Sequence, residues 1–243
     1  LWDGTVSLYN IKTKTLPIGL YPRLEEYCKD NGIDINFKKC DRFDSVVERF
    51  YQEEIDTKHF VDDLKLASKA GPITARDYQI TAIHKAITDK RVTLISPTSS
   101  GKSAIIYSTI RWILSENPGS RVLLIVPNVA LVNQMMGDFR EYSTENGWDV
   151  EEHCQRLFGG QSKDLVKDVL ITTWQSFSKI SKDKVNGPKI LSLYKGVIVD
   201  ECQSAKGVEL QGILEKCVHS EYRIGTTGTL DTRPDAKVNT LQI

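Results

Sequence analysis

The chain has 243 residues, and its 32 lysines and arginines are balanced by 32 aspartates and glutamates. This composition is typical of a soluble globular protein. Because the net charge is zero, binding to a nucleic acid would depend on a local basic patch. No apolar run approaches the roughly 20 residues that span a bilayer, and the start is not a signal peptide. The five scattered cysteines form no C-x-x-C pair, which favours reduced thiols in a cytosolic protein over disulfides or zinc.

Residues 1–72 are predicted to form a small α+β domain, which we take as a DNA-binding accessory. "TVSLYNI" and "IDINF" alternate as strands do, and Pro22–Asn31 opens with proline and stops before a glycine, as helices do. A charged segment then predicts a helix from about Thr57 to Lys69. The Gly71-Pro72 pair indicates the domain boundary.

Residues 73–243 change to short apolar runs that alternate with helical stretches. Near-continuous runs of valine, isoleucine and leucine suit parallel strands that are covered on both faces. The runs are "RVTLIS", "RVLLIVP", "DVLITT", "KGVIVDE" and "YRIGTTG". Helical stretches such as Lys102–Glu116 and Ala130–Tyr142 lie between them. Repeated strand–helix–strand units predict an α/β domain with a mostly parallel sheet.

The stretch "SPTSSGKS" nearly fits the phosphate-binding pattern G-x-x-x-x-G-K-[ST], with Ser96 in place of the first glycine. It follows a predicted strand and precedes a helix, whose free N–H groups favour an anion. Gly101 lets the backbone approach a phosphate, Lys102 reaches the β- and γ-phosphates, and the Ser103 hydroxyl can ligate Mg²⁺. Ser96 is tolerated if its φ is negative, because a Cβ is penalised mainly at positive φ. The remaining loop residues are Pro97, Thr98, Ser99 and Ser100.

Asp200 and Glu201 end the apolar strand "GVIVDECQ". Open α/β sheets bind ligands at the carboxyl ends of their strands. A phosphate-loop ATPase needs one acid there to hold Mg²⁺ and a neighbouring carboxylate for the attacking water. Either motif alone also fits a chance polar run, but the two together predict an ATPase site.

The ordered motifs "PTSSGKS", "DECQ" and "TGT" resemble motifs I, II and III of the superfamily two helicases. The segment "ARDYQITAI" is similar to the family's adenine-contacting segment, with Arg76 and Gln79 at the matching positions. The resemblance implies a RecA-like domain that binds ATP and Mg²⁺, with the metal on Ser103 and Asp200. It also implies that Thr227, Gly228 and Thr229 link the nucleotide state to DNA. The pattern "WDG…LPIGL" near the start is similar to that of phage recombination helicases.

Two further stretches resemble nucleic-acid-contacting motifs of the same family. "IVPNVALVNQ" resembles motif Ia, and "TTWQS" resembles the motif that follows it. The resemblance implies contacts to the DNA backbone from Asn128, Gln134, Thr173, Trp174 and Gln175. For Trp174, packing of the helix behind it is an equal alternative.

The chain departs from the family pattern in two places. Gln203 stands where related proteins usually have histidine, and glutamine cannot carry a proton or a charge. The sequence therefore leaves open whether ATP hydrolysis is coupled to movement along DNA. Nothing in the chain resembles motifs IV to VI, which include an arginine finger. With no initial methionine and the ending "KVNTLQI", we expect a fragment with little or no ATP turnover of its own.

The resemblance implies an ATP-driven DNA motor that migrates branches and unwinds forked or branched DNA in the host bacterial cytoplasm. Another superfamily two translocase, such as a restriction-type motor or an RNA helicase, is the alternative within enzymes. A DNA-binding module without useful hydrolysis is an alternative of another class. A phosphate-loop kinase is disfavoured, because nothing resembles a lid. The sequence predicts no membrane partner and no particular oligomeric state.

Overall fold

The computed structural model describes residues 11–16, 20–34, 54–97, 99–159, 164–204 and 208–228. Its contacts divide the chain into two compact units. The first is Leu1–Gln52 with Asp231–Thr240, and the second is Glu53–Leu230 with Leu241–Ile243. The division lies near residue 53, earlier than the predicted boundary at residues 71–72.

The described part of the first unit is built on helix α1, Tyr21–Asp30. This confirms the predicted helix, displaced by one residue, with a proline in its first turn. At the helix end, the Tyr27 carbonyl accepts from both the side chain of Asn31, at 2.7 Å, and its backbone amide, at 3.1 Å. The predicted strands "TVSLYNI" and "IDINF" fall almost entirely outside the described residues.

The second unit begins with helix α3, Glu54–Asp63, so the prediction of a helix from Thr57 to Lys69 was wrong at both ends. The chain turns at Lys65, which has a left-handed φ of 46°. It then forms an antiparallel hairpin of β1, Ala67–Ser68, and β2, Gly71–Pro72. The helix ends early because Leu66 and Ala67 are buried, and a two-stranded turn places them there.

A six-stranded sheet forms the centre of this unit, and every pairing in it is parallel. Its order is β3-β8-β7-β4-β6-β5. The strands are β3 Arg91–Ile95, β4 Arg121–Val126, β5 Cys154–Leu157, β6 Val169–Thr173, β7 Tyr194–Val199 and β8 Tyr222–Thr227. Five of them are the predicted apolar runs, and β5 is an additional edge strand. We call the two ends of this sheet the carboxyl edge and the amino edge.

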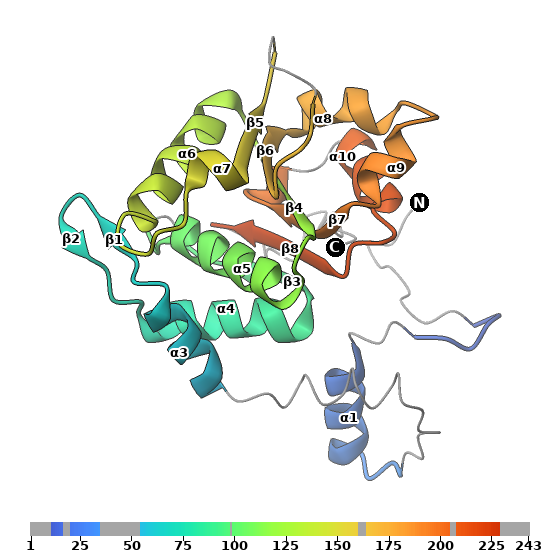
Figure 1. The fold of residues 1–243 in the computed structure, drawn as a ribbon. Coiled ribbons are helices and arrows are strands. Elements are labelled where there is room, and N and C mark those ends of the chain that lie inside the picture. Colours follow the sequence, from blue (N-terminus) through green and yellow to red (C-terminus); the bar gives the residue numbers. More distant parts are fainter. Residues whose placement is uncertain are drawn as a thin grey trace. The chain divides into compact units, whose positions relative to one another are not determined.

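Helices cover both faces of the sheet (Figure 1). Along β4, Val122 and Leu124 belong to one apolar core, whereas Leu123 and Ile125 belong to the other. This alternation explains why the strand reads as one continuous apolar run. The first face carries α4 Asp77–Asp89, α5 Lys102–Glu116, α6 Val129–Tyr142 and α7 Val150–His153. The second carries α8 Trp174–Ser181, α9 Gly187–Leu191 and α10 Val208–Lys216.

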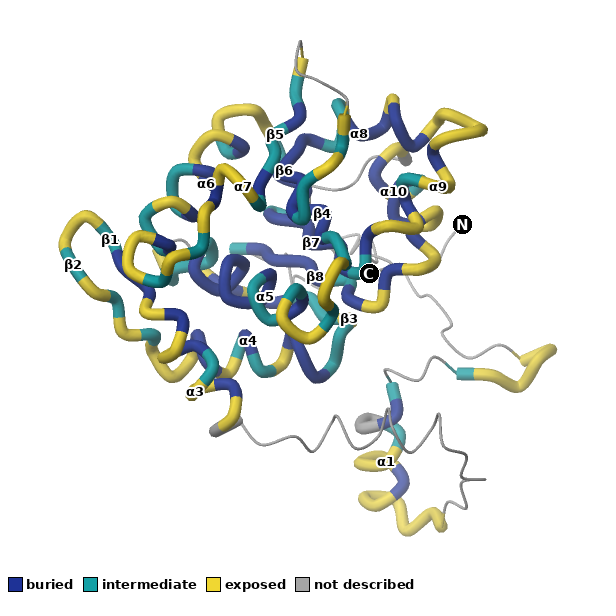
Figure 2. Tube along the Cα trace, viewed as in Figure 1, coloured by how far each residue is buried: buried dark blue, intermediate teal, exposed yellow. Residues whose placement is uncertain are grey.

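The central strands and the inner faces of the helices are buried, and the outer helix faces are exposed (Figure 2). Helix α5 has the bounds predicted for it, and α6 begins one residue earlier than predicted. In the described part of the chain, no helix is long and apolar enough to cross a membrane. The cysteines described, Cys28, Cys154, Cys202 and Cys217, are buried free thiols.

Candidate nucleotide-binding site

The strand register brings the predicted ATP motifs together at the carboxyl edge. Ile95 of β3 lies opposite Thr227 of β8, and Val199 of β7 lies opposite Gly225 of β8. The Ser96 amide therefore donates to the Thr227 carbonyl at 2.8 Å, just where the phosphate loop leaves the sheet. Motifs I, II and III thus follow three neighbouring strands and meet at one edge.

The phosphate loop tolerates Ser96 for the predicted reason. Ser96 is not among the described residues with a positive φ, so its Cβ meets no backbone penalty. Its side chain is buried and hydrogen-bonds the Ser100 hydroxyl. Ser99 and Gly101 take the left-handed conformations instead, with φ of 66° and 80°. Thr98 lies outside the described residues.

The adenine-contacting segment packs directly on this loop. Gln79 accepts from the Arg76 amide and donates to the Ser100 carbonyl, each at 2.9 Å. Gly101 has a left-handed φ of 80°, which favours glycine, and a Cβ there would lie 2.3 Å from Nε2 of Gln79 and force that amide to move. Tyr78, which the sequence did not single out, also donates to the Ser100 carbonyl, at 3.1 Å.

A hollow of about 380 Å³ lies beside the loop, between β3 and α4. Apolar side chains and the loop backbone line it: Tyr78, Ala82, Leu94, Ile95, Ser96, Pro97, Ser100 and Ile105. The hollow lies next to Gln79 and the exposed Arg76 side chain, the two residues that the family resemblance assigns to adenine contacts. Its apolar surface suits an adenine base.

The predicted catalytic charges are in contact. The Lys102 ammonium pairs with Oε1 of Glu201 and lies 3.9 Å from Oδ1 of Asp200. Burial raises the pKa of the Glu201 carboxyl, but hydrogen bonds from Lys102 and Gln203 outweigh it and leave that pKa below its usual value. Glu201 therefore stays charged at neutral pH. Its φ of 49° is rare for a residue with a side chain, a kind of strain that collects at functional sites.

A chain of hydrogen bonds joins motif II to motif III. Gln203 donates to Oε2 of Glu201 at 2.6 Å, and the Thr227 hydroxyl donates to Oε1 of Gln203 at 2.5 Å. The Gly228 backbone also hydrogen-bonds Glu201. Gln203 thus bridges Glu201 and Thr227 without needing the proton that histidine would carry. Thr229 lies outside the described residues.

Asp200 and Ser103 offer the oxygen donors that Mg²⁺ prefers. Burial raises the pKa of the Asp200 carboxyl, while a hydrogen bond from Thr226 and the charge of Lys102 act against that rise. The Thr226 hydroxyl, which the sequence did not single out, donates to Oδ1 of Asp200 at 2.7 Å. The Ser103 hydroxyl lies 2.8 Å from the Tyr142 hydroxyl. A carboxylate and a hydroxyl beside a phosphate loop fit a magnesium ion that is completed by water and phosphate.

The five predicted DNA contacts lie in different environments. Asn128 is exposed and caps α6 by accepting from the Leu131 amide at 3.0 Å, and Gln134 and Gln175 are also exposed. Thr173 is buried, and its hydroxyl caps α8. Trp174 is half-buried against the second-face core, which is the packing alternative noted from the sequence.

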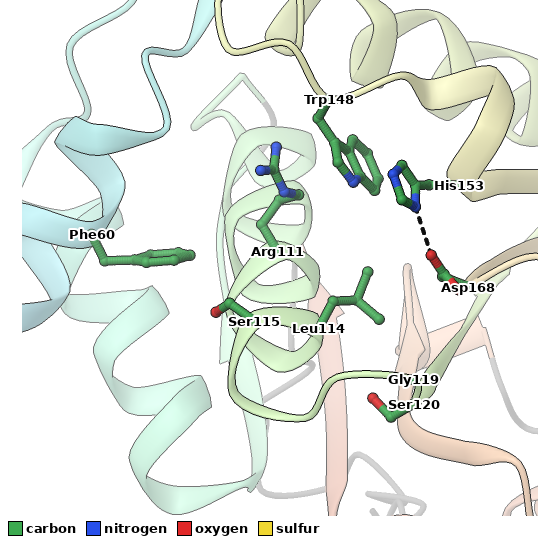
Figure 3. Close-up of a pocket in the computed structure, with 9 residues that line it drawn as sticks. All are labelled: Phe60, Arg111, Leu114, Ser115, Gly119, Ser120, Trp148, His153 and Asp168. Carbon is green, nitrogen blue, oxygen red and sulfur yellow. Dashed lines mark hydrogen bonds and ion pairs between the residues drawn. The ribbon is translucent and has the colours of Figure 1, made fainter.

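A second pocket, of about 280 Å³, lies at the amino edge of the sheet (Figure 3). Arg111, Trp148 and His153 lie in a row there. The guanidinium carbon is 4.7 Å from the Trp148 ring centre, and the imidazole stacks on the other side of that ring at 5.0 Å. His153 pairs with Asp168 at 2.6 Å. Arg111, Trp148, His153 and Asp168 thus engage one another, whereas the buried hydroxyl of Ser120, which also lines the pocket, has no hydrogen-bond partner. The pocket lies at the opposite end of the strands from the phosphate loop.

Comparison with known proteins places the chain in a family. Residues 72–232 match the family described as "Type III restriction enzyme, res subunit". The chain belongs to this family. It is 29% identical to the ATP-dependent DNA helicase uvsW of Enterobacteria phage T4, over 99% of this chain and 45% of that protein. It is 23% identical to the DNA 3'-5' translocase XPB2 of Sulfurisphaera tokodaii, over 81% of this chain and 40% of that protein.

A solved structure agrees with these matches. The crystal structure of the UvsW helicase from bacteriophage T4 matches with a TM-score of 0.69 at 25% identity, covering 94% of this chain and 77% of that chain. The predicted resemblance to superfamily two helicases, the phage type included, is confirmed, as is the mostly parallel α/β fold. The chain spans less than half the length of the curated relatives that it matches.

Proposed function

We propose that this protein is an ATP-dependent DNA motor that migrates branches and unwinds forked or branched DNA during phage recombination, in the host cytoplasm. The observation that carries the proposal is the connected network from Lys102 through Glu201 and Gln203 to Thr227. It joins the phosphate-binding lysine to the motif that links nucleotide and DNA in the family. A site built only to bind an anion would not need that connection.

In this proposal, ATP would lie along the loop from Pro97 to Ser103 with its base beside Arg76 and Gln79, and Ser103 and Asp200 would hold Mg²⁺. The bound ATP–Mg²⁺ supplies the phosphoryl group and the charge that neutralises its oxygens. Lys102 exchanges Glu201 for the phosphates, which releases that carboxylate to orient the attacking water. Gln203 keeps its hydrogen bond to Oε2 of Glu201, which orients the carboxylate, and an ionised Glu201 can accept a proton from that water.

DNA would lie against the loops that follow β4 and β6. Asn128 and the exposed amides of Gln134 and Gln175 are the side chains best placed for backbone contacts. Thr173 would act through its cap on α8, and Trp174 through the packing of the same helix. We assign residues 1–72, the predicted N-terminal domain ahead of the res-subunit match, the role of a DNA-binding accessory.

The test is ATP hydrolysis and strand separation by the full-length protein on branched DNA, linear DNA and RNA. We expect branched DNA to stimulate most. Lys102→Ala should abolish both activities, and Glu201→Gln should lower kcat by about 10² to 10⁴ while leaving ATP binding intact. Loss of hydrolysis with unchanged strand separation would contradict the motor and favour a binding module.

Stimulation by RNA alone, or translocation on linear duplex without strand separation, would favour the alternative of another superfamily two translocase. We expect the 243-residue chain by itself to hydrolyse ATP slowly. No stretch in it resembles the arginine-finger motif, and such a finger contributes about 10³ to 10⁵ in rate. Rapid DNA-stimulated turnover by this chain alone would contradict that expectation.

A further inference from the structure

The Ser103 hydroxyl has two partners on helix α6 that neither the motifs nor the relatives assign. The Tyr142 hydroxyl lies 2.8 Å from it. The Asp138 carboxyl is the second, because a hydrogen bond from Ser103 lowers its pKa against the rise caused by burial. Asp138 also hydrogen-bonds the side chain of Gln134, one turn earlier on the same helix. A continuous path therefore runs from Gln134, a candidate DNA contact, to Ser103, a candidate metal ligand.

The chemistry of these groups gives each hydrogen bond a direction. Ser103 donates its single hydrogen to Asp138, and this hydrogen bond lowers the pKa of the Asp138 carboxyl against the rise that burial causes. The Tyr142 hydroxyl then donates to one of the two lone pairs of Ser103. One lone pair of Ser103 remains, and the two bonds to α6 fix where it points. Such outer partners orient a metal-ligating side chain and tune its affinity.

Packing holds the two partners in place. The Tyr142 ring lies 5.6 Å from that of Tyr107, and Tyr107 itself hydrogen-bonds Ser143 at 2.8 Å and accepts from Arg111 at 2.6 Å. These contacts clamp the end of α6 against the middle of α5. Ser103 is the second residue of α5, so the clamp sets the position of its hydroxyl relative to α6.

We propose that Asp138 and Tyr142 are positioning residues that aim the Ser103 hydroxyl at Mg²⁺ and connect it through α6 to Gln134. This inference rests on the proposed ATP site. A shift of α6 on contact with DNA would move Asp138 and Tyr142 together and so alter how Ser103 meets the metal. The link is separate from the path through Gln203 and Thr227, which reaches Glu201.

The test measures binding of a non-hydrolysable ATP analogue to the full-length protein, first in EDTA and then across a Mg²⁺ titration. We expect Tyr142→Phe and Asp138→Asn each to raise the half-saturating Mg²⁺ concentration about 10-fold. Binding in EDTA should stay as in the wild type. Tyr142→Phe keeps the ring packing, and Asp138→Asn keeps the shape but removes the charge and replaces one acceptor oxygen with an N–H donor.

Glu141→Gln is the matched control. Glu141 lies on the same helix and loses the same charge on substitution, but its partner is Lys69, at 3.2 Å, and not Ser103. Its Mg²⁺ dependence should equal that of the wild type. Mn²⁺, which binds oxygen ligands more tightly than Mg²⁺, should narrow the gap between the variants and the wild type. A defect of packing alone would not respond to the metal.

Equal Mg²⁺ dependence of wild type and both variants would overturn this inference and leave the ATP site standing. Equal weakening in EDTA and in Mg²⁺ would also overturn it, because it would indicate a loss of structure. A wild-type protein that binds no nucleotide under any condition would instead overturn the proposed function. Gln134→Ala should lower the stimulation by DNA with little change in the Mg²⁺ dependence measured without DNA.

Discussion

The two edges of the central sheet both place charged side chains beside a hollow, yet their construction differs. At the carboxyl edge, Ser99, Gly101 and Glu201 all have left-handed backbone conformations, and Lys102 and Glu201 hold each other in place of a ligand. At the amino edge, Arg111, Trp148, His153 and Asp168 stack and pair among themselves. Left-handed residues occur at both edges, since Lys90 and Gly119 at the amino edge have φ of 60° and 77°. The difference therefore lies in the charged groups: Lys102 and Glu201 stand beside a loop whose helix start favours an anion, whereas the charged groups of the amino-edge pocket engage one another.

The topology explains this difference. In a parallel sheet every strand delivers its following loop to the carboxyl edge, so motifs that are distant in sequence converge there. The amino edge receives the segments that enter strands, and these need only close the core. We therefore expect substitutions at the carboxyl edge to impair ATP turnover and substitutions at the amino edge to change the stability of the fold.

Gly101→Ala should give the largest effect in this comparison. The added Cβ would displace the Gln79 amide, which donates to the Ser100 carbonyl of the phosphate loop, and a displacement of about 1 Å in a catalytic site costs about 10² in rate. We expect kcat/KM for ATP to fall at least that far in a steady-state assay of the full-length protein.

Gly119→Ala is the matched control at the amino edge. Gly119 has φ of +77°, close to the +80° of Gly101, but nothing lies within 4 Å of the added Cβ. Both substitutions should lower the free energy of unfolding by a similar amount, about 1 to 2 kcal/mol, because alanine is strained in the left-handed conformation. Only Gly101→Ala should lose ATP turnover, and an equal loss in both would remove the distinction between the edges.

Trp148→Ala tests whether the amino-edge pocket is structural. The substitution removes the ring between Arg111 and His153. Because Trp148 is only half-buried, we expect a loss of about 2 kcal/mol in the free energy of unfolding, below the roughly 3 to 5 kcal/mol of a fully buried aromatic. Denaturant titration measures this loss. An ATPase rate that falls well below that of the wild type, measured under conditions where the variant is folded, would show that the pocket has a functional role.

We expect the smallest effect on stability from the loss of the Glu221 carboxylate, which pairs with Lys90 and Lys195 at the amino edge. Burial raises the pKa of Glu221, but hydrogen bonds from Lys195 and Lys90 outweigh it and lower that pKa to about 2. Because the pKa of Glu221 is lower in the folded than in the unfolded protein, the ionised carboxylate stabilises the fold at pH values above 4.5. This stabilisation is lost as the pH falls toward 2.

Glu221→Gln should therefore be less stable than the wild type at pH 6, by an amount that shrinks between pH 4.5 and 2. Glu221 is well exposed, so the difference should be small. Denaturant midpoints at pH 6 and pH 3 measure it. A difference that grows on acidification would contradict the assignment of the ion pair.

Local patterns determined most of the fold and the identity of the ATP motifs. The five apolar strands were predictable because burial on both faces demands near-continuous valine, isoleucine and leucine. The phosphate loop and the Asp200-Glu201 pair were predictable because their chemistry needs those residue types beside a helix start and a strand end. Strand β5, "CQRL", was not, since an edge strand with two half-buried polar residues lacks that signature. The end of α3 was missed because tertiary burial of Leu66 and Ala67 decides it.

Only the tertiary structure decided which side chains meet within the site. The pattern assigned Lys102 and Glu201 separate roles, but their contact depends on β7 and β3 being separated by β8 alone. Likewise, Thr226, Asp138 and Tyr142 carry no motif of their own. They reach Asp200 and Ser103 because the strand register and the packing of α6 on α5 place them there. Sequence patterns encode what each element is, whereas contacts between distant elements depend on how those elements pack.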